Sequence, residues 1–180
     1  MRKVILFCLL LTLSLCACSS AKETAKTDLE STLTELCIGD PTQAMLYTTG
    51  SLIADELSNR DGESDLHRKI RGYVRYEIDS VVIEADTAQA ELTIQAPNML
   101  QILQNHAETS NNVDALLAAV HTTLDSGDMP QITFELTVML RQVDGHWYLV
   151  PNTALSNALS GGLLDRYAEI LQSVMEGGAA

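Results

Sequence analysis

The 180-residue sequence has few basic residues and none of the common catalytic motifs. Lys and Arg total 11 against 24 Asp and Glu, which gives a formal net charge of −13. Such an acidic chain is repelled by phosphate backbones, which argues against nucleic acid as a partner. The patterns G-x-S-x-G, H-E-x-x-H, C-x-x-C, the phosphate-binding loop and the EF-hand calcium loop are all absent. The sequence therefore assigns no catalytic residue, metal ligand or cofactor.

The apolar run at the N-terminus is too short to cross a bilayer, which takes about 20 residues. It covers residues 4–15 without a charge and follows the basic pair Arg2 and Lys3. A short cationic start followed by a short apolar run is typical of a secretory signal peptide. We therefore expect residues 1–17 to be a signal peptide that takes no part in the fold.

The stretch Leu15-Cys16-Ala17-Cys18 spans the end of this expected signal peptide, and it resembles the lipobox of bacterial lipoproteins. The resemblance implies that the thiol of Cys18 receives a diacylglyceryl group and that Cys18 becomes the mature N-terminus, carrying fatty acids such as palmitate. Two or more acyl chains hold a protein stably on a membrane. The implied location is extracytoplasmic, on the cell membrane or, in a double-membrane envelope, on the outer membrane.

Two other interpretations of the cysteine pair remain. One is a metal site, but such a site would need cysteines at a wider spacing than C-x-C and further Cys or His partners nearby. Plain secretory cleavage after Ala17 predicts the same compartment without the lipid. In the lipoprotein interpretation, residues 18–27 are small and polar and form a lipidated flexible tether, with a random-coil reach of about 15 to 18 Å.

The mature chain is more acidic still and keeps one free thiol. Loss of Arg2 and Lys3 leaves 9 basic residues (11 − 2 = 9) against 24 acidic ones, a formal charge of −15. Because Cys8 and Cys16 leave with the signal peptide and Cys18 carries lipid, Cys37 stands alone in an oxidising compartment. Such a thiol is most often a buried small hydrophobe. The alternative is a disulfide between two copies of the chain.

Residues 28–180 fit a single domain that begins with helices. Thr27 and Glu30 form a capping-box pattern, which predicts a helix from Thr27 that stops at Gly39. Asp40-Pro41 predicts a second short helix that reaches Tyr47, and apolar residues at 52–57 suggest a third. Residues 58–65 have the composition of a loop.

The apolar period changes to two after Gly72, as expected for strands. The alternation shifts between Ile78 and Val81, which predicts a β-bulge near residues 79–80. A second alternating stretch at 90–96 completes a hairpin that Pro97 ends. Helices are then expected at 98–108 and from Asn111 or Asn112 to Gly127.

A second hairpin is predicted around Asp144-Gly145, because this pair tolerates the positive φ of a type I′ turn. The two-residue loop pairs Val143 with His146 and Leu140 with Leu149. It also places the single tryptophan on the core face, so that the predicted structural core contains Phe134, Leu136, Trp147 and Leu149. The opposite face is half apolar and open to another element or a partner. Asn152 or Thr153 caps a final helix, which Gly161-Gly162 interrupts for reasons of close packing or, alternatively, ligand approach.

These elements predict an α+β fold: a curved antiparallel sheet with N-terminal helices, a helical insertion between two hairpins and a C-terminal helix. The element order and the hairpin at residues 140–149, with its D-G-H-W turn, resemble the cone-shaped nuclear transport factor 2-like superfamily. In small lipoproteins of that kind, such a hairpin is frequent. The long final helix and the two inserted helices depart from the simple pattern and leave the strand order open.

Two functional hypotheses follow. The first is a noncatalytic, membrane-anchored envelope lipoprotein that binds a small apolar ligand or a protein partner, with a homodimer among the options. Its candidate surface contains Tyr73, Tyr76, Arg141, His146 and Tyr148. The alternative is a cyclase-like or isomerase-like enzyme that works inside the cone, as enzymes of the resembled superfamily do. Its candidate acid-base groups are His67, His106, His121 and His146, although no motif carries a catalytic role over to any of them.

Overall fold

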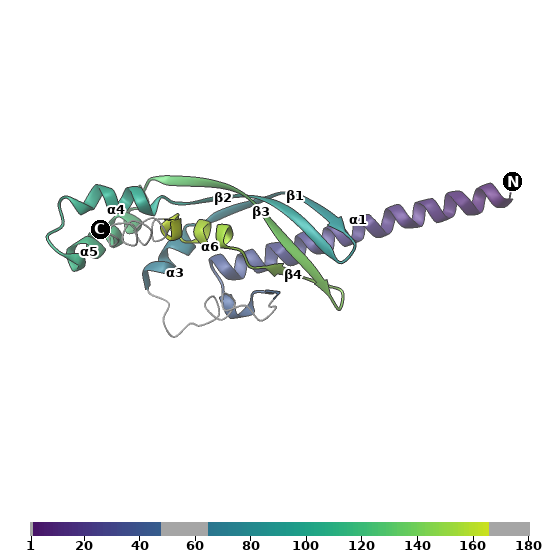
Figure 1. Cartoon of the computed structure of the whole chain (residues 1–180), viewed down its shortest axis with the longest axis horizontal. Helices are drawn as coiled ribbons and strands as arrows, with labels where there is room; N and C mark the ends of the chain where they lie inside the picture. Colours follow the sequence, from purple (N-terminus) through teal and green to yellow (C-terminus); the bar gives the residue numbers. More distant parts are fainter. Residues whose placement is uncertain (1, 48–64, 166–180) are drawn as a thin grey trace, which may run out of the picture.

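The computed structural model describes residues 2–47 and 65–165. Within them, the fold is α+β, with helices packed on one curved antiparallel sheet of four strands, which confirms the expected fold class. The strand order is β1-β2-β3-β4, so each strand pairs with its neighbour in sequence. Figure 1 shows the sheet arched over α1 and α6, with α4 and α5 at the end opposite the N-terminus.

The first helix, α1 (Arg2–Cys37), is longer than the sequence predicted. Thr27 lies inside α1, so the capping-box start was wrong, and residues 19–27 are helical where a flexible tether was expected. Helix formers such as Ala, Lys and Glu dominate this stretch, which contains no Gly or Pro. The hydroxyl of Thr24 donates to the carbonyl of Ser20, one turn earlier, at 3.0 Å.

The chain after α1 is less helical than expected. Only the 3-10 turn η1 (Pro41–Gln43) follows, and residues 45–47 then run beside the edge strand β4 (His146–Val150). The N–H of Leu149 donates to the carbonyl of Met45 at 2.9 Å, and the N–H of Tyr47 donates to the carbonyl of Leu149 at 2.7 Å. This pairing overturns the short helix predicted to reach Tyr47. The helix suggested at residues 52–57 lies outside the described residues.

The first hairpin joins β1 (Arg75–Glu84) to β2 (Thr87–Pro97). Its register shifts between Ile78 and Ser80, as the sequence predicted. The helix α3 (Asp65–Gly72) precedes β1 and was not predicted. Arg71 in α3 donates to the carbonyl of Leu36, which places a cation at the C-terminus of α1.

The second hairpin joins β3 (Gln131–Val143) to β4. Val143 pairs with His146 and Leu140 with Leu149, which confirms the register derived from the Asp144-Gly145 turn. Both turn residues have positive φ, 50° at Asp144 and 86° at Gly145. The turn chemistry therefore fixed which side chains of this hairpin face the core.

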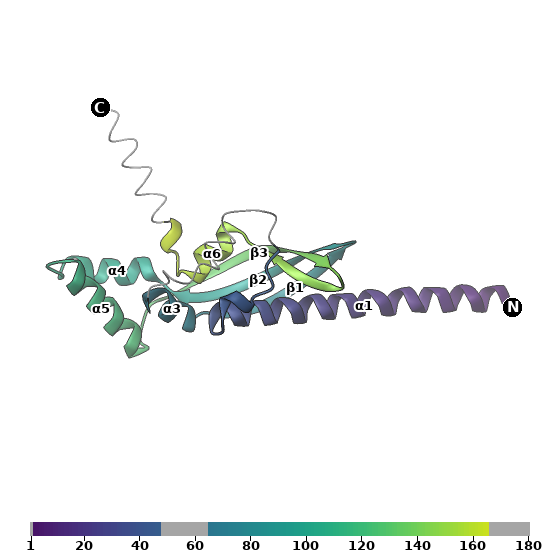
Figure 2. The ribbon, with the colours of Figure 1, turned by 90° about the horizontal axis from the view of Figure 1, so that it is seen from below.

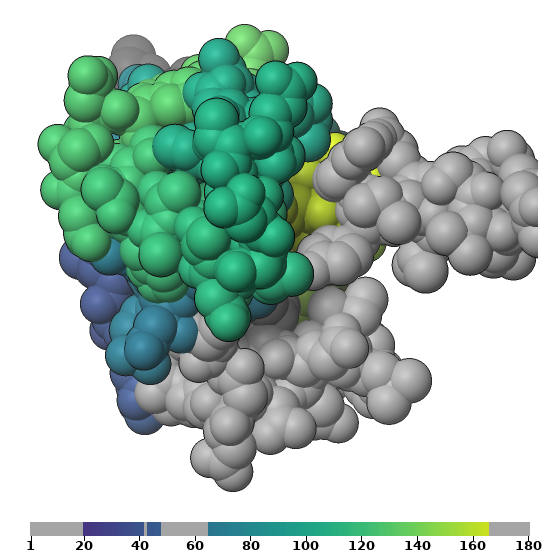
Figure 3. Space-filling model, turned by 90° about the vertical axis from the view of Figure 1, so that its left-hand side faces the viewer, coloured from purple at the N-terminus to yellow at the C-terminus, as the bar shows by residue number. Residues whose placement is uncertain are grey.

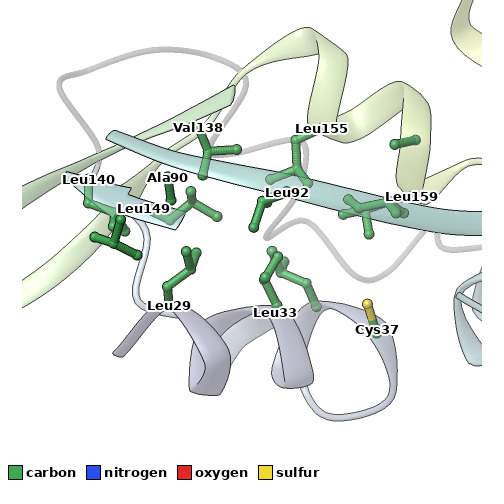
Figure 4. Close-up of a cluster of buried hydrophobic side chains, with 14 of the residues drawn as sticks. Leu29, Leu33, Cys37, Ala90, Leu92, Val138, Leu140, Leu149, Leu155 and Leu159 are labelled. Carbon is green, nitrogen blue, oxygen red and sulfur yellow. The ribbon is translucent and has the colours of Figure 1, made fainter. Parts of the chain in front are cut away.

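The main core lies between the concave face of the sheet and the helices α1 and α6 (Thr153–Leu159). Figure 4 shows Leu29 and Leu33 of α1 pointing toward Leu92 of β2, with Leu155 and Leu159 of α6 beside them. Trp147 is 1% exposed and Leu149 is fully buried, as predicted. Phe134 and Leu136 are only half-buried and pack against the edge of this core.

A second, smaller core joins α3 to the helical insertion, α4 (Met99–Ala107) and α5 (Val113–Ser126). Asn98 and Asn112 cap these helices, and Gly127 ends α5 with φ of 71°. Figure 2 shows the insertion at the end of the molecule opposite the N-terminus, and Figure 3 views the molecule from this end. The molecule therefore has an insertion end and, opposite it, a turn end formed by the two β-turns.

The glycine pair after α6 serves close packing. Asn152 caps α6, and the helix ends where the N–H of Gly162 donates to the carbonyl of Asn157 at 2.9 Å. Gly161 has φ of 66°, and a Cβ there would lie 2.3 Å from the carbonyl oxygen of Pro97. The structure thus supports the packing interpretation of Gly161-Gly162.

Candidate partner-binding surface

The outer face of the β3–β4 hairpin gathers large side chains that the core does not use. Because Leu140, Trp147 and Leu149 point into the core, the residues that alternate with them point outward. We call the resulting surface the outer hairpin patch and define it as Tyr47, Met139, Arg141, Val143, His146 and Tyr148.

Arg141 is the best-positioned polar group of this patch. It pairs across the strands with Tyr148. Its guanidinium carbon lies 5.1 Å from the centre of the Tyr47 ring, within cation–π range. One guanidinium nitrogen is 3.7 Å from the Asp86 carboxylate. These contacts hold the cation on the outer face, among aromatic rings.

Apolar side chains border Arg141 on the same strand. Met139 is 42% exposed and Val143 is 39% exposed, although both are large hydrophobic residues. The residues that contribute most to binding at protein interfaces are often arginine and tyrosine surrounded by apolar side chains. The patch can therefore bury apolar area and also offer one directed hydrogen-bond donor.

The structure brings together only part of the predicted surface. Arg141, His146 and Tyr148 lie on the outer hairpin patch. Tyr76 instead points inward, where its hydroxyl lies 2.7 Å from that of Thr34 and donates to the carbonyl of Glu30 at 3.1 Å. Tyr73 packs against the second core. Tyr76 therefore joins β1 to α1, Tyr73 packs among the helices of the second core, and neither lines the patch.

Tyr47 was not among the predicted surface residues, because the sequence pattern placed it in a short helix. Tyr47 reaches the patch through the parallel bridge between Leu46 and Leu149. The local signal was a run of three large residues at 45–47, which is too short to indicate a strand. A contact between segments about a hundred positions apart leaves no pattern within either segment.

The concave side of the sheet is filled by side chains. Leu29 and Leu33 of α1 are fully buried, and Trp147 beside them is almost so. Among the described residues, the buried indole N–H of Trp147 has no hydrogen-bond partner. These side chains occupy the space between the sheet and α1.

One histidine and one carboxylate approach each other at the turn end. His146 Nδ1 lies 3.9 Å from Asp28 Oδ2, and the same carboxylate oxygen accepts the backbone N–H of Trp147 at 2.8 Å. The imidazole is largely exposed, while the carboxylate is committed to the backbone. Of the other histidines, His106 bonds Thr123 at 2.8 Å and links α4 to α5.

Cys37 is buried in the main core and is unpaired. Burial raises the pKa of its thiol from 9.0 to about 11, and the nearby positive charges of Arg71 and Arg75 oppose this rise only in part. A thiol that is buried and protonated is inert. The structure thus favours the small buried hydrophobe over an intermolecular disulfide.

Comparisons of the chain with protein-family models, curated proteins and solved structures give no match. In the described part of the chain, the search for membrane-spanning helices finds no candidate. The same residues contain no group of three or more His, Cys, Asp or Glu arranged to hold a metal ion.

Proposed function

We propose that this chain is a noncatalytic envelope lipoprotein that binds a protein partner through the outer hairpin patch. Acyl chains on Cys18 anchor it to the outer surface of the cell membrane or, in a double-membrane envelope, to the outer membrane. The anchor rests on the cationic start, the short apolar run and the lipobox-like Leu15-Cys16-Ala17-Cys18.

The surroundings of Arg141 are the observation that best supports the binding of a protein partner. Its guanidinium lies over the Tyr47 ring, while exposed Met139 and Val143 extend the surface along β3. Tyrosine and arginine supply most of the energy at many interfaces because they combine apolar area with directed hydrogen bonds.

A protein partner is better supported than a small apolar ligand. A ligand inside the cone would compete for the space that Leu29, Leu33 and Trp147 fill. Displacing such side chains costs about 2–5 kcal/mol for each large residue. The packed interior disfavours the cyclase-like alternative for the same reason.

Photo-crosslinking tests the binding surface directly. A photoreactive amino acid replaces Val143 in the patch or, as a matched control, Thr133 on the same face of β3. Each variant is then expressed in the native cells, so that it reaches the envelope. We expect one defined crosslinked species from position 143 and none from position 133. The Arg141→Glu substitution should abolish the species from position 143.

The alternatives give different results in the same experiment. A crosslinked product of twice the chain mass identifies a second copy of this protein as the partner. Equal crosslinking at positions 143 and 133, or crosslinking that Arg141→Glu leaves unchanged, contradicts a specific patch. Mass spectrometry of the membrane fraction tests the anchor, because the N-terminal peptide should begin at Cys18 and carry a diacylglyceryl group.

A further inference from the structure

The helix α1 enters the core only a few residues after the expected lipidation site. Residues 19–37 contain no Gly or Pro, and α1 is continuous through them. Ala25 is the first residue of this stretch that is fully buried, followed by Leu29 and Leu33. At 1.5 Å per residue, about 10 Å of helix separates Cys18 from Ala25.

Three contacts along α1 fix the helix to the rest of the fold. In the C-terminal third of α1, Asp28 accepts the backbone N–H of Trp147 at 2.8 Å. Two turns later, Thr34 meets the Tyr76 hydroxyl at 2.7 Å. At its end, the carbonyl of Leu36 accepts from Arg71. These three contacts, spread along the helix, prevent α1 from rotating or sliding against the sheet.

The direction of α1 determines which end of the molecule lies near residue 18. In Figures 1 and 2, the N-terminal half of α1 runs out past the two β-turns, away from α4 and α5. The two turns are joined, because the N–H of Gln142 donates to the carbonyl of Asp86 at 2.8 Å. From Asp28, which lies level with His146, the helix rises about 15 Å to Cys18.

We infer that α1 is a rigid stalk that holds the turn end of the sheet toward the lipid surface and the insertion end, α4 and α5, away from it. This inference rests on the proposed lipidation of Cys18. The surface that faces the membrane is formed by the two turns and by residues 20–24 of α1. The two turns carry the carboxylates of Glu84, Asp86 and Asp144, of which Asp86 pairs with Arg141, while exposed Lys22 and Lys26 lie on α1. Because carboxylates predominate at the turns themselves, anionic headgroups repel the turns, which stand off the lipid instead of inserting into it.

The orientation also has a consequence for the outer hairpin patch. Val143 and His146 adjoin the membrane-facing turn. A partner that reaches the patch must therefore come close to the bilayer, within the length of a few turns of α1. A membrane-attached partner satisfies this condition, whereas a large soluble one would meet the lipid surface first.

Energy transfer to labelled lipid tests the stalk. The lipidated full-length protein is placed in vesicles of phosphatidylcholine and phosphatidylglycerol that contain a headgroup-labelled acceptor. A donor dye is attached at Asp144→Cys in the turn or at Asn111→Cys between α4 and α5. Native Cys37 can remain, because its thiol is buried and protonated.

We expect transfer from position 144 to exceed transfer from position 111 several-fold. Insertion of about six Gly and Ser residues between Ser20 and Ala21 adds a coil of about 13 Å, and the difference should largely disappear. Equal transfer from the two positions without the insertion would overturn the stalk, as would a difference that the insertion leaves intact.

Mass spectrometry of the same samples separates the two possible failures. An N-terminus without lipid at Cys18 overturns the proposed anchor and the stalk with it. A lipidated Cys18 combined with equal transfer overturns the stalk alone.

Discussion

The backbone N–H of Trp147 donates a 2.8 Å hydrogen bond to the carboxylate of Asp28, which lies 119 residues earlier. Together with the bonds between Leu149 and residues 45–47, this contact occupies backbone groups on the free edge of β4. Covering an edge strand in this way prevents pairing with other chains. The same contact fixes the position of α1 along the sheet.

Loss of the Asp28 carboxylate should therefore destabilise the fold. We expect Asp28→Ala to lower the free energy of unfolding by about 1–3 kcal/mol, because the Trp147 N–H loses its acceptor in a partly buried place. Asp28→Asn keeps an acceptor oxygen and should cost less. Urea unfolding followed by tryptophan fluorescence measures both variants. Equal costs for Ala and Asn would contradict this assignment.

Tyr76 should stabilise the fold through its hydroxyl. Tyr76→Phe removes the contacts with Thr34 and with the Glu30 carbonyl, so we expect a loss of about 1 kcal/mol. A double-mutant cycle with Thr34→Val should show coupling between the two residues. Additive effects in denaturant unfolding would mean that the hydroxyls do not interact.

The Leu29 side chain tests whether the concave side of the sheet is packed. Leu29→Ala should cost about 2–5 kcal/mol, because the residue is fully buried. Leu117→Ala on the exposed face of α5 is the matched control and should change stability by about 0.5 kcal/mol or less. A cost at Leu29 as small as that at Leu117 would mean that the interior is open enough to admit a ligand.

Gly161 should not tolerate a side chain. Gly161→Ala combines positive φ with a contact of 2.3 Å to the Pro97 carbonyl oxygen, so we expect a loss of about 2–5 kcal/mol. Gly127→Ala has a similar φ of 71° but open space around it, and it should cost only about 1–2 kcal/mol. Thermal unfolding of the two variants separates the steric cost from the backbone cost.

Cys37 should make stability fall in alkaline solution. Its thiol has a pKa of about 11 in the fold against 9.0 as a free side chain. Between these values the unfolded chain loses the proton while the native chain keeps it, so unfolding becomes more favourable as pH rises. Stability below pH 9 is unaffected by this group.

The Cys37→Ala variant isolates this effect from other alkaline titrations. The difference in unfolding free energy between the natural chain and the variant should be constant below pH 9 and should shift against the natural chain up to pH 11. A thiol reagent at pH 8 should react quickly only after denaturation. Fast reaction in the native state, or a difference that does not change with pH, would be inconsistent with a buried thiol.

Short-range chemistry made several elements predictable. Asp144-Gly145 favours one turn type, and that turn sets which residue pairs across the hairpin, so the buried position of Trp147 followed directly. Asn98, Asn112 and Asn152 each accept a backbone N–H three residues later, which is a local interaction. Alternating apolar residues likewise revealed the bulge between Ile78 and Ser80.

The candidate surface was only partly predictable for the opposite reason. Strand alternation placed Arg141, His146 and Tyr148 on one face. Neither the inward turn of Tyr76 toward α1 nor the arrival of Tyr47 beside Arg141 has a local signal, because each depends on a distant segment.

The sequence alone determined the Asp144-Gly145 turn, the asparagine caps and the faces of β3 and β4, since these arise from interactions among residues close together in the chain. Only the tertiary structure decided how far α1 extends, what covers the edge of β4 and whether the concave face is filled. Those features depend on contacts between segments far apart in sequence, such as Asp28 with Trp147, whose free energy exists only once the chain is folded.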